Sequence, residues 1–386
     1  MDQPKAPGNL FERNPQKIIF LVVLGFLIIV TYAAEKVLEF RMRPQVYRLG
    51  ATRYVKLREL GPGYADVLEP TDLGLKLSDG LARKGYPVRV DDNGFIIPSK
   101  IHERPDLTIV FLGGSTTECL YMEEENRFPY VVGRLLEEKT GKKTNSYNGG
   151  KAGNNSLHAI DLLINKIIPL KPDVVVFMEN INDLSVLLYQ KTYWTVGNAR
   201  SPIIDKPATL KTVGKNLEED FHLLRDLLIP NLAREFRKIS LRFRNLDEFQ
   251  GSRGKQIQID ENYLVHEFSL NLQTLVSICQ ARNLTPVLMT QANRLTAQPD
   301  PFVRRVMQRL EQEQGISYAD YKKIYDKFNA AIVAVGAKNH LTVIDLAGEV
   351  PPAKEFFVDL VHFNDHGSRY AAKIISERLA PLVGAN

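Results

Sequence analysis

The chain opens with a long apolar stretch. Residues 18–34 read IIFLVVLGFLIIVTYAA and hold no charged side chain, and Lys17 and Glu35 bound them. As a helix they would extend about 25 Å, close to the thickness of the bilayer's hydrocarbon core. We therefore expect a tail over residues 1–16 and one transmembrane helix over residues 17–36. A signal peptide cleaved near Ala33 and a buried core helix are the alternatives.

The orientation of this helix is not decided by the charges beside it. The leading tail carries Lys5, Arg13 and Lys17, while the trailing flank carries more Lys and Arg. Large domains are translocated largely regardless of such charges. We expect the N-terminus inside and the body of the protein outside the cytoplasm, on the periplasmic or extracellular side.

Residues 37–104 predict a stalk and a small β region. Side chains alternate over residues 88–90, residues 91–94 read DDNG, and an apolar run resumes at residues 95–97. Alternation on both sides of turn-forming residues is typical of a β-hairpin.

From Leu107 the pattern changes to alternating strands and helices. Apolar runs of strand length lie at residues 108–112, 174–178, 286–290 and 341–346. Amphipathic stretches of helical length lie at residues 129–139, 157–168, 262–282 and 318–337. This alternation predicts a three-layer α/β/α domain over residues 105–386, with a parallel sheet between two layers of helices. In such sheets, sites form at the carboxyl ends of the strands.

A long insertion interrupts the alternation at about residues 188–260. Its apolar positions recur at helical spacing, so we expect a largely helical segment over residues 217–244 with a break at Pro230. It could be a helix packed on the body with a solvated basic face. A lid and a membrane-surface contact are the alternatives.

Charge and cysteine content exclude several classes of protein. The formal net charge is only +5, and the basic residues gather in two segments, residues 35–60 and 233–255, with seven Lys or Arg each. This near-neutral body is not typical of a nucleic-acid-binding protein. Two cysteines cannot build a disulfide framework, and no CxxC, HExxH or phosphate-loop motif is present. We expect no metal and no nucleic acid.

Four segments could carry chemistry, and each follows a predicted strand or precedes a predicted helix. A serine at the end of a strand can lie near backbone donors, a glycine can turn an N–H toward an oxyanion, and an asparagine amide can donate to the same oxygen. An Asp and a His three residues apart can hold an imidazole ring toward a hydroxyl. The segments are Gly113-Gly114-Ser115, residues 148–156, residues 179–183 and residues 359–367.

In this order, the four segments resemble those of the SGNH, or GDSL-type, serine hydrolase superfamily, over about residues 105–385. The resemblance implies that Ser115 is the nucleophile, that Asp359 and His362 complete a catalytic triad, and that the Ser115 N–H, Gly153 and Asn182 form an oxyanion hole. Gly149 or Gly150 could take the place of Gly153, because three glycines crowd this segment.

Two departures from the common motifs stand out. Gly113-Gly114-Ser115 replaces the usual Gly-Asp-Ser, as in a branch of the superfamily with a GGSTT serine block. Residues 180–183, NIND, replace a Gly-x-Asn-Asp block and leave Asn182 in register.

The resemblance implies an acyl ester hydrolase that works through an acyl-serine intermediate without metal or organic cofactor. Combined with the membrane helix, it leads us to expect small O-acyl groups, such as acetyl, on carbohydrate or envelope polymers as substrates. An O-acyltransferase or a lipid esterase using the same site is one alternative. A catalytically silent scaffold of an envelope complex is another. The sequence predicts no particular protein partner.

Overall fold

The computed structural model describes residues 14–41, 57–195 and 257–384, together with single residues between 202 and 236. The chain divides into two compact units. One contains residues 1–46 and 206–246, and the other contains residues 47–205 and 247–386. We describe each unit by itself. Most of the predicted helix over residues 217–244 lies outside the described residues.

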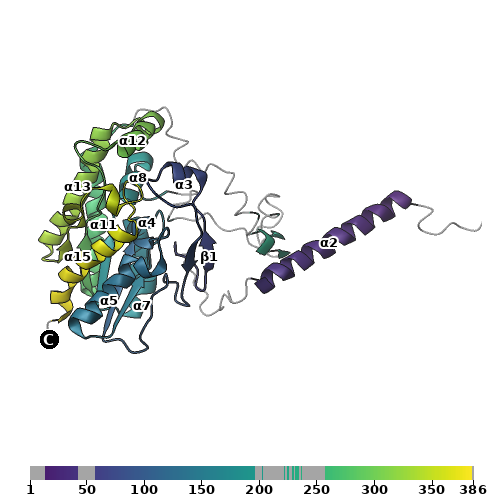
Figure 1. The fold of residues 1–386 in the computed structure, drawn as a ribbon, viewed down its shortest axis with the longest axis horizontal. Coiled ribbons are helices and arrows are strands. Elements are labelled where there is room, and N and C mark those ends of the chain that lie inside the picture. The colour runs from purple at the N-terminus through teal and green to yellow at the C-terminus, as the bar shows by residue number, and fades with distance from the viewer. Residues whose placement is uncertain are drawn as a thin grey trace, which may run out of the picture. The chain divides into compact units, whose positions relative to one another are not determined.

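The larger unit is built on a five-stranded parallel sheet (Figure 1). The strands run in the order β4-β3-β5-β6-β7, and each neighbouring pair is parallel. Their bounds are β3 Leu107–Gly113, β4 Thr144–Asn148, β5 Val174–Met178, β6 Thr285–Met289 and β7 Val343–Ile344. The predicted three-layer fold with a parallel sheet is confirmed. The sheet order changes direction between β3 and β5, so their carboxyl ends form an edge where a site can open.

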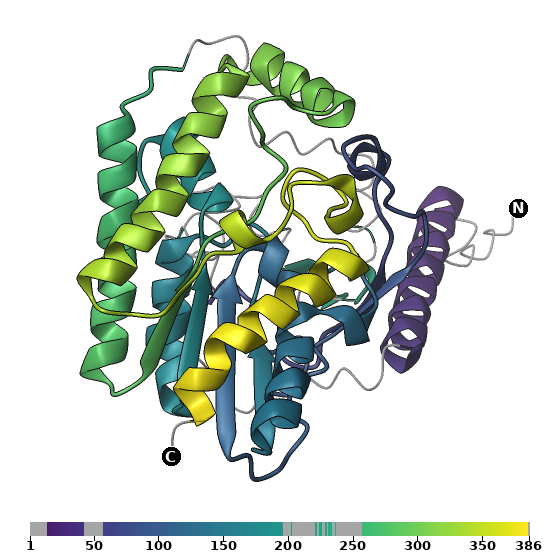
Figure 2. The same cartoon turned by 60° about the vertical axis from the view of Figure 1, so that its left-hand side comes forward.

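Helices cover both faces of this sheet. Along β3, Val110 and Leu112 belong to the core on one face, and Ile109 and Phe111 belong to the core on the other. Helices α6, α8, α11, α12 and α13 contribute side chains to the first core, and α5 and α15 contribute to the second. Figure 2 shows α15, in yellow, crossing one face of the sheet.

The helix bounds agree closely with the amphipathic pattern. The long helices are α5 Phe128–Thr140, α8 Ile181–Gln190, α11 Glu261–Ala281, α12 Pro301–Gln314, α13 Tyr318–Lys338 and α15 Asp365–Gly384. The short ones are α3 Asp72–Lys76, α4 Ser115–Glu118, α6 Ser156–Leu162, α7 Ile168–Leu170 and α14 Leu346–Glu349. The helix predicted over residues 157–168 is in fact α6 and α7 joined by a π-helical turn at Leu163–Ile167. Single 3₁₀ turns lie at Glu124–Asn126 and Lys354–Phe356.

A small antiparallel sheet precedes the large one. Strands β1 Ala65–Leu68 and β2 Tyr86–Arg89 pair with each other. The predicted hairpin is reduced to one antiparallel bridge between Val90 and Ile96, closed by a turn in which the Gly94 N–H donates to the Asp91 oxygen. Ile96 also bridges to Asn148 at the end of β4, which ties this region to the large sheet.

The smaller unit contains one long apolar helix, α2 Pro15–Arg41. Its stretch Gln16–Leu38 has a mean hydropathy of 2.5 and is long enough to cross a membrane. Large apolar side chains along it are exposed, among them Phe20 and Ile29. Length and composition therefore agree with the membrane helix or signal sequence predicted for this region.

The two cysteines are free and buried on opposite faces of the large sheet. Cys119 lies in the core beneath α5 and α15, and Cys279, a residue of α11, points into the core on the other face. Burial raises the pKa of both thiols to about 12.

Candidate active site

Ser115 lies where β3 gives way to a helix. The strand ends at Gly113, Gly114 is the N-cap residue of α4, and Ser115 is the first residue of that short helix. A Cβ atom on Gly113 would come within 2.7 Å of the Met178 carbonyl oxygen at the end of β5. Only glycine therefore lets the chain leave the sheet this close to its neighbour, which brings Ser115 to the carboxyl edge of the strands.

Three predicted residues come together as a chain of hydrogen bonds. His362 Nε2 lies 2.6 Å from Ser115 Oγ, and His362 Nδ1 lies 2.6 Å from Asp359 Oδ2. The other oxygen of Asp359 accepts from the backbone N–H groups of Val361 and His362, at 2.9 and 2.8 Å. The carboxylate thus fixes both the ring and the turn that carries it, which is the geometry a serine nucleophile and its base require.

The charges of this pair shift both ionisations. Burial acts to raise the pKa of Asp359, but the charge and hydrogen bond of His362 and the two backbone donors outweigh it, so the pKa is lowered. Burial acts to lower the pKa of His362, but the charge and hydrogen bond of Asp359, together with the Glu118 charge, raise it above its ordinary value of 6.5. The pair thus favours an ionised carboxylate beside a ring that accepts a proton readily.

The three candidate glycines differ in what their backbones do. The Gly149 N–H donates to the Phe111 oxygen at 2.9 Å, and the Gly150 N–H donates to Asn148 Oδ1 at 3.0 Å. A Cβ atom on Gly150 would come within 2.4 Å of the Glu118 nitrogen, so this glycine is needed for packing against α4. Gly153 has a φ of +78°, a conformation that favours glycine.

The amide of Asn182 lies beside the serine turn. Its Nδ2 donates to the Asn154 carbonyl oxygen at 2.7 Å, and Asn182 is only 7% exposed. A Cβ atom on Gly114 would lie 2.1 Å from the same nitrogen. The glycine that replaces the usual aspartate of the serine motif therefore gives the Asn182 amide room to approach the residue before Ser115.

Asp183, the next residue, holds the loop between β4 and α6, residues 149–155, to the start of α8. Its Oδ1 accepts from the Ser156 N–H at 3.0 Å, from the Ser156 hydroxyl, and from the Tyr193 hydroxyl at 2.7 Å. Ser156 begins α6, directly after the loop. Asn182 and Asp183 thus bind the loop at two points, one on either side of Asn155, which caps α6.

Burial raises the pKa of Asp183 to about 6. Glu179, at the end of β5, has its pKa raised by burial and by the Asp183 charge. Two carboxyl groups in one buried site disfavour each other's ionisation. Glu179 and Asp183 therefore form a buried pair in which the charge of each carboxyl group opposes ionisation of the other.

A second set of contacts reaches the loop from the opposite side. Glu118 is fully buried and accepts from the Ala152 N–H at 2.6 Å and from Lys151 Nζ at 3.2 Å. Arg58 Nη1 donates to the Ala152 carbonyl oxygen at 2.6 Å and to Asn154 Oδ1 at 2.7 Å. Residues 151–154 are therefore held by α4 and by the segment that leads into the small β region.

Gln291 connects the remaining parts of the site. It follows β6, and its amide donates to Thr116 Oγ1 at 2.8 Å while its oxygen accepts from the Ile181 N–H at 3.0 Å. Thr116 directly follows the serine, and Ile181 begins α8. Gln291 thus links the serine turn to the helix that carries Asn182.

Sequence reasoning missed Arg58, Glu118, Asp183 as a support, and Gln291. Asp183 belongs to the recognised segment 179–183, and Glu118 lies three residues after Ser115, so an acidic residue close to each motif was an available signal. Arg58 lies 57 positions before Ser115, and no sequence pattern indicates that it would reach the loop.

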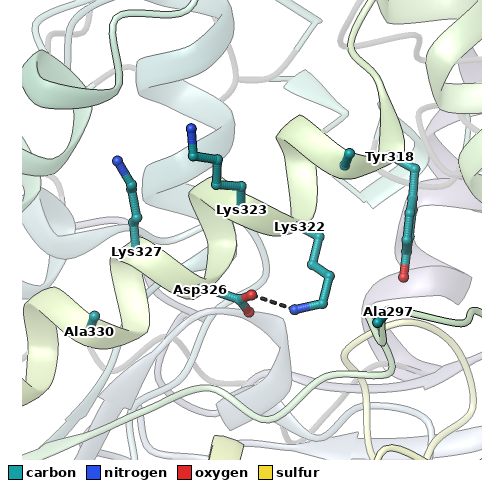
Figure 3. A pocket seen from close by; sticks show the side chains of 8 residues that line it. Ala297, Tyr318, Lys322, Lys323, Asp326, Lys327 and Ala330 are labelled. Carbon is teal, nitrogen blue, oxygen red and sulfur yellow. Dashed lines mark hydrogen bonds and ion pairs between the residues drawn. The ribbon is translucent and has the colours of Figure 1, made fainter.

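A separate pocket of about 530 Å³ lies along α13 and contains none of the residues above (Figure 3). Its lysines are paired: Lys322 with Asp326, and Lys323 and Lys327 with Glu261. No cluster of His, Cys, Asp and Glu able to hold a metal ion occurs among the described residues.

Comparison with known proteins bears on the family and the fold. The model of the GDSL-like lipase/acylhydrolase family matches residues 111–370. No curated protein matches the chain. Solved structures similar to the chain include three from bacteria. A protein described as a GDSL-like lipase, from Parabacteroides merdae, shares 14% identity and a TM-score of 0.42, over 72% of this chain and 98% of its own.

The lipase/acylhydrolase from Enterococcus faecalis shares 17% identity and a TM-score of 0.41, over 72% of this chain and 96% of its own. Axe2, an acetylxylan esterase from Geobacillus stearothermophilus, shares 14% identity and a TM-score of 0.38, over 73% of this chain and 95% of its own. At these values, the structural likenesses carry no argument about substrate.

Proposed function

Since this chain belongs to the GDSL-like lipase/acylhydrolase family and is an esterase of the SGNH type, we propose that it cleaves acyl esters through a covalent intermediate on Ser115. The observation that carries the proposal is the line of contacts from Ser115 Oγ through the His362 ring to the Asp359 carboxylate, with 2.6 Å at each step. Nucleophile, base and orienting acid at these distances are what serine catalysis requires.

In the first half of the reaction, Ser115 Oγ attacks the ester carbonyl carbon while His362 Nε2 takes the hydroxyl proton. Asp359 stabilises the imidazolium that results. When the tetrahedral intermediate collapses, the C–O bond to the alcohol breaks, and the imidazolium returns its proton to the leaving oxygen. The acyl group stays on Ser115.

In the second half, water attacks the acyl-serine with His362 again acting as base, and the carboxylic acid leaves. The carbonyl oxygen carries negative charge in both tetrahedral intermediates. Its proposed donors are the backbone N–H groups of Ser115 and Gly153 and the side-chain amide of Asn182. Gly149 and Gly150 already donate their N–H groups within the protein, which supports the choice of Gly153. One such donor contributes about 10²- to 10³-fold to the rate.

We place the enzyme at a membrane, with α2 as a retained anchor, residues 18–34 in the bilayer, and residues 105–386 outside the cytoplasm. An anchored esterase acts on what lies within reach of the membrane surface. We infer that its substrate is a small O-acyl group, such as acetyl, carried by a carbohydrate or another envelope polymer. Alkaline carbonate extraction and protease digestion of intact spheroplasts test the anchor and the side of the membrane.

The catalytic proposal is tested with a fluorophosphonate probe on the full-length protein. Wild type should be labelled, and Ser115→Ala should lose labelling and at least about 10⁴-fold in hydrolysis of an aryl acetate. Ser269→Ala, on α11, is the matched control and should retain both. Absence of labelling in folded wild-type protein would overturn the proposal and would favour a catalytically silent scaffold of an envelope complex.

Substrate and reaction type need separate measurements. Aryl esters of increasing acyl length and an acetylated oligosaccharide, compared with a phospholipid, distinguish a carbohydrate esterase from a lipid esterase. Adding a sugar acceptor and following the acyl group distinguishes hydrolysis from transfer. Product found only as free acid supports the hydrolase, whereas acylated acceptor supports the transferase.

A further inference from the structure

A buried carboxylate lies at the end of the apolar helix. Glu35 directly follows the uncharged stretch of residues 18–34 and is only 6% exposed. It accepts three hydrogen bonds from two residues of the insertion: from the Asn231 N–H at 3.0 Å, from Asn231 Nδ2 at 2.6 Å, and from the Leu232 N–H at 2.9 Å. Figure 1 shows a short helical segment in teal beside α2. Glu35 thus holds the start of a helical segment within the smaller unit.

This insertion exposes large apolar side chains. Phe221, Leu224 and Leu228 are helical, are separated by three and four positions, and therefore share one face of a helix. Their exposed fractions are 64%, 55% and 63%, and Phe236 is 64% exposed. An apolar face of this kind left in water is unfavourable and marks an interaction surface.

The position of Glu35 along α2 says how deep this surface lies. Glu35 precedes the end of the apolar span at Leu38 by three residues, which corresponds to about 5 Å along the helix axis. A segment bonded to Glu35 is therefore held within a few ångströms of the boundary between hydrocarbon and headgroups. Residues 221–236 themselves carry no net charge, because Arg225 and Arg234 are balanced by Asp226 and Glu235.

We propose that the insertion around residues 221–236 is a membrane-interfacial element, whose exposed apolar side chains, Phe221, Leu224, Leu228 and Phe236, enter the lipid. The depth of the segment and its exposed apolar face both favour a lipid surface as the partner. The proposal rests on α2 being a retained anchor. It assigns Glu35 the role of holding the element at the bilayer surface.

The test uses full-length protein in vesicles of phosphatidylcholine and phosphatidylglycerol. Leu224→Cys is labelled with an environment-sensitive fluorophore, and lipids carrying a nitroxide near the headgroup act as quenchers. The native cysteines are buried, so the new thiol is the accessible target. We expect blue-shifted emission and at least twofold stronger quenching than at the control position Leu270→Cys, an exposed residue on α11.

A second variant tests the role of Glu35. Glu35→Ala should reduce quenching at position 224 by at least half, while α2 still retains the protein in the membrane after carbonate washing. Unchanged quenching would contradict the holding role of Glu35. Water-like, unquenched emission from the wild-type background in retained protein would overturn the proposal. So would crosslinking of position 224 to a second copy in place of quenching by lipid. Release of the protein by carbonate would instead refute the anchor.

Discussion

Asp359 binds its neighbours with both carboxylate oxygens. One oxygen meets the His362 ring, and the other accepts two backbone N–H groups of the same turn. An asparagine could preserve part of this network, but it could not balance the charge of an imidazolium. Electrostatic and geometric contributions of this residue can therefore be separated by one substitution.

We expect Asp359→Asn to lower kcat by about 10⁴-fold, because the neutral side chain neither stabilises the imidazolium nor fixes the ring tautomer. In wild type the neutral ring is the base, so kcat/KM should fall as the pH drops through the His362 pKa, with its midpoint above 6.5. Loss of the anion should move that midpoint to lower pH. Rates measured from pH 5 to 9 check this, with Asp326→Asn on α13 as control. An unmoved midpoint would contradict it.

Gly114 offers a test of the Asn182 amide that leaves Asn182 itself unchanged. Its φ of −85° is open to any residue, so Gly114→Ala should fold. The new methyl group would lie where Asn182 Nδ2 lies, however, and would displace that amide. We expect kcat to fall by about 10²- to 10³-fold with a smaller change in KM. Kinetics of Gly114→Ala, Asn182→Ala and the double variant check this, and additive losses would argue against a shared cause.

The loop between β4 and α6, which carries the proposed donor Gly153, is held by several separate elements. Asn182 and Asp183 hold it from α8, Glu118 holds it from α4, and Arg58 holds it from the segment before β1. A loop fixed at this many points needs little rearrangement when the carbonyl oxygen of the substrate becomes negatively charged. Arg58, which precedes both sheets in the chain, therefore helps to hold the loop of the candidate site.

Arg58→Ala should loosen this loop without touching the triad. Losing a charged donor to two acceptors costs about 2 kcal/mol locally, so we expect kcat/KM to fall about tenfold or more. Amide hydrogen exchange over residues 151–155 should become faster at the same time. Arg83→Ala, which removes an exposed ion pair with Asp72, is the control and should change neither quantity. Normal exchange with reduced activity would mean that Arg58 acts in another way.

The buried carboxyl group of Asp183 gives a prediction about stability. The pKa of Asp183 in the folded protein is about 6, above its value of 3.8 in an unfolded chain, so folding favours the protonated form. The stability contributed by this group is fully present below about pH 4 and is lost as the pH rises through about 6. Asp183→Asn should remove this loss. The difference in melting temperature between the variant and wild type should therefore grow in favour of the variant from pH 4 to 7.

For the molecule as a whole, the apolar runs predicted the sheet well. The strand over residues 174–178 has its predicted bounds. Successive side chains of a strand point to opposite faces, so five consecutive apolar residues are typical of a strand that is buried on both faces of a sheet. Strand β4 was missed because its sequence, TNSYN, is polar. Its side chains are nevertheless buried, since their polar groups find partners in distant segments. For example, Ser146 Oγ donates to the Pro129 oxygen and Asn145 Nδ2 donates to the His102 oxygen. Tertiary partners of this kind are invisible in a single sequence.

The candidate site divides in the same way. Ser115, Gly153, Asn182, Asp359 and His362 were predicted through motifs, and the structure brings the serine, the acid and the histidine into contact. The proposal of Gly153 over Gly149 and Gly150 needed coordinates, because it depends on which N–H groups already donate within the protein. The support from Arg58 and Gln291 depends on contacts between distant segments, which have no local pattern.

The placement of the two thiols has a consequence for the proposed location of the catalytic domain outside the cytoplasm. Cys119 and Cys279 belong to cores separated by the thickness of the sheet, so no native disulfide can join them. In an oxidising compartment, the folded chain would therefore form no disulfide between these cysteines, and its buried thiols would be protected from oxidation. Export of the chain would therefore require no disulfide isomerase. A thiol reagent should react with both cysteines only after the protein unfolds.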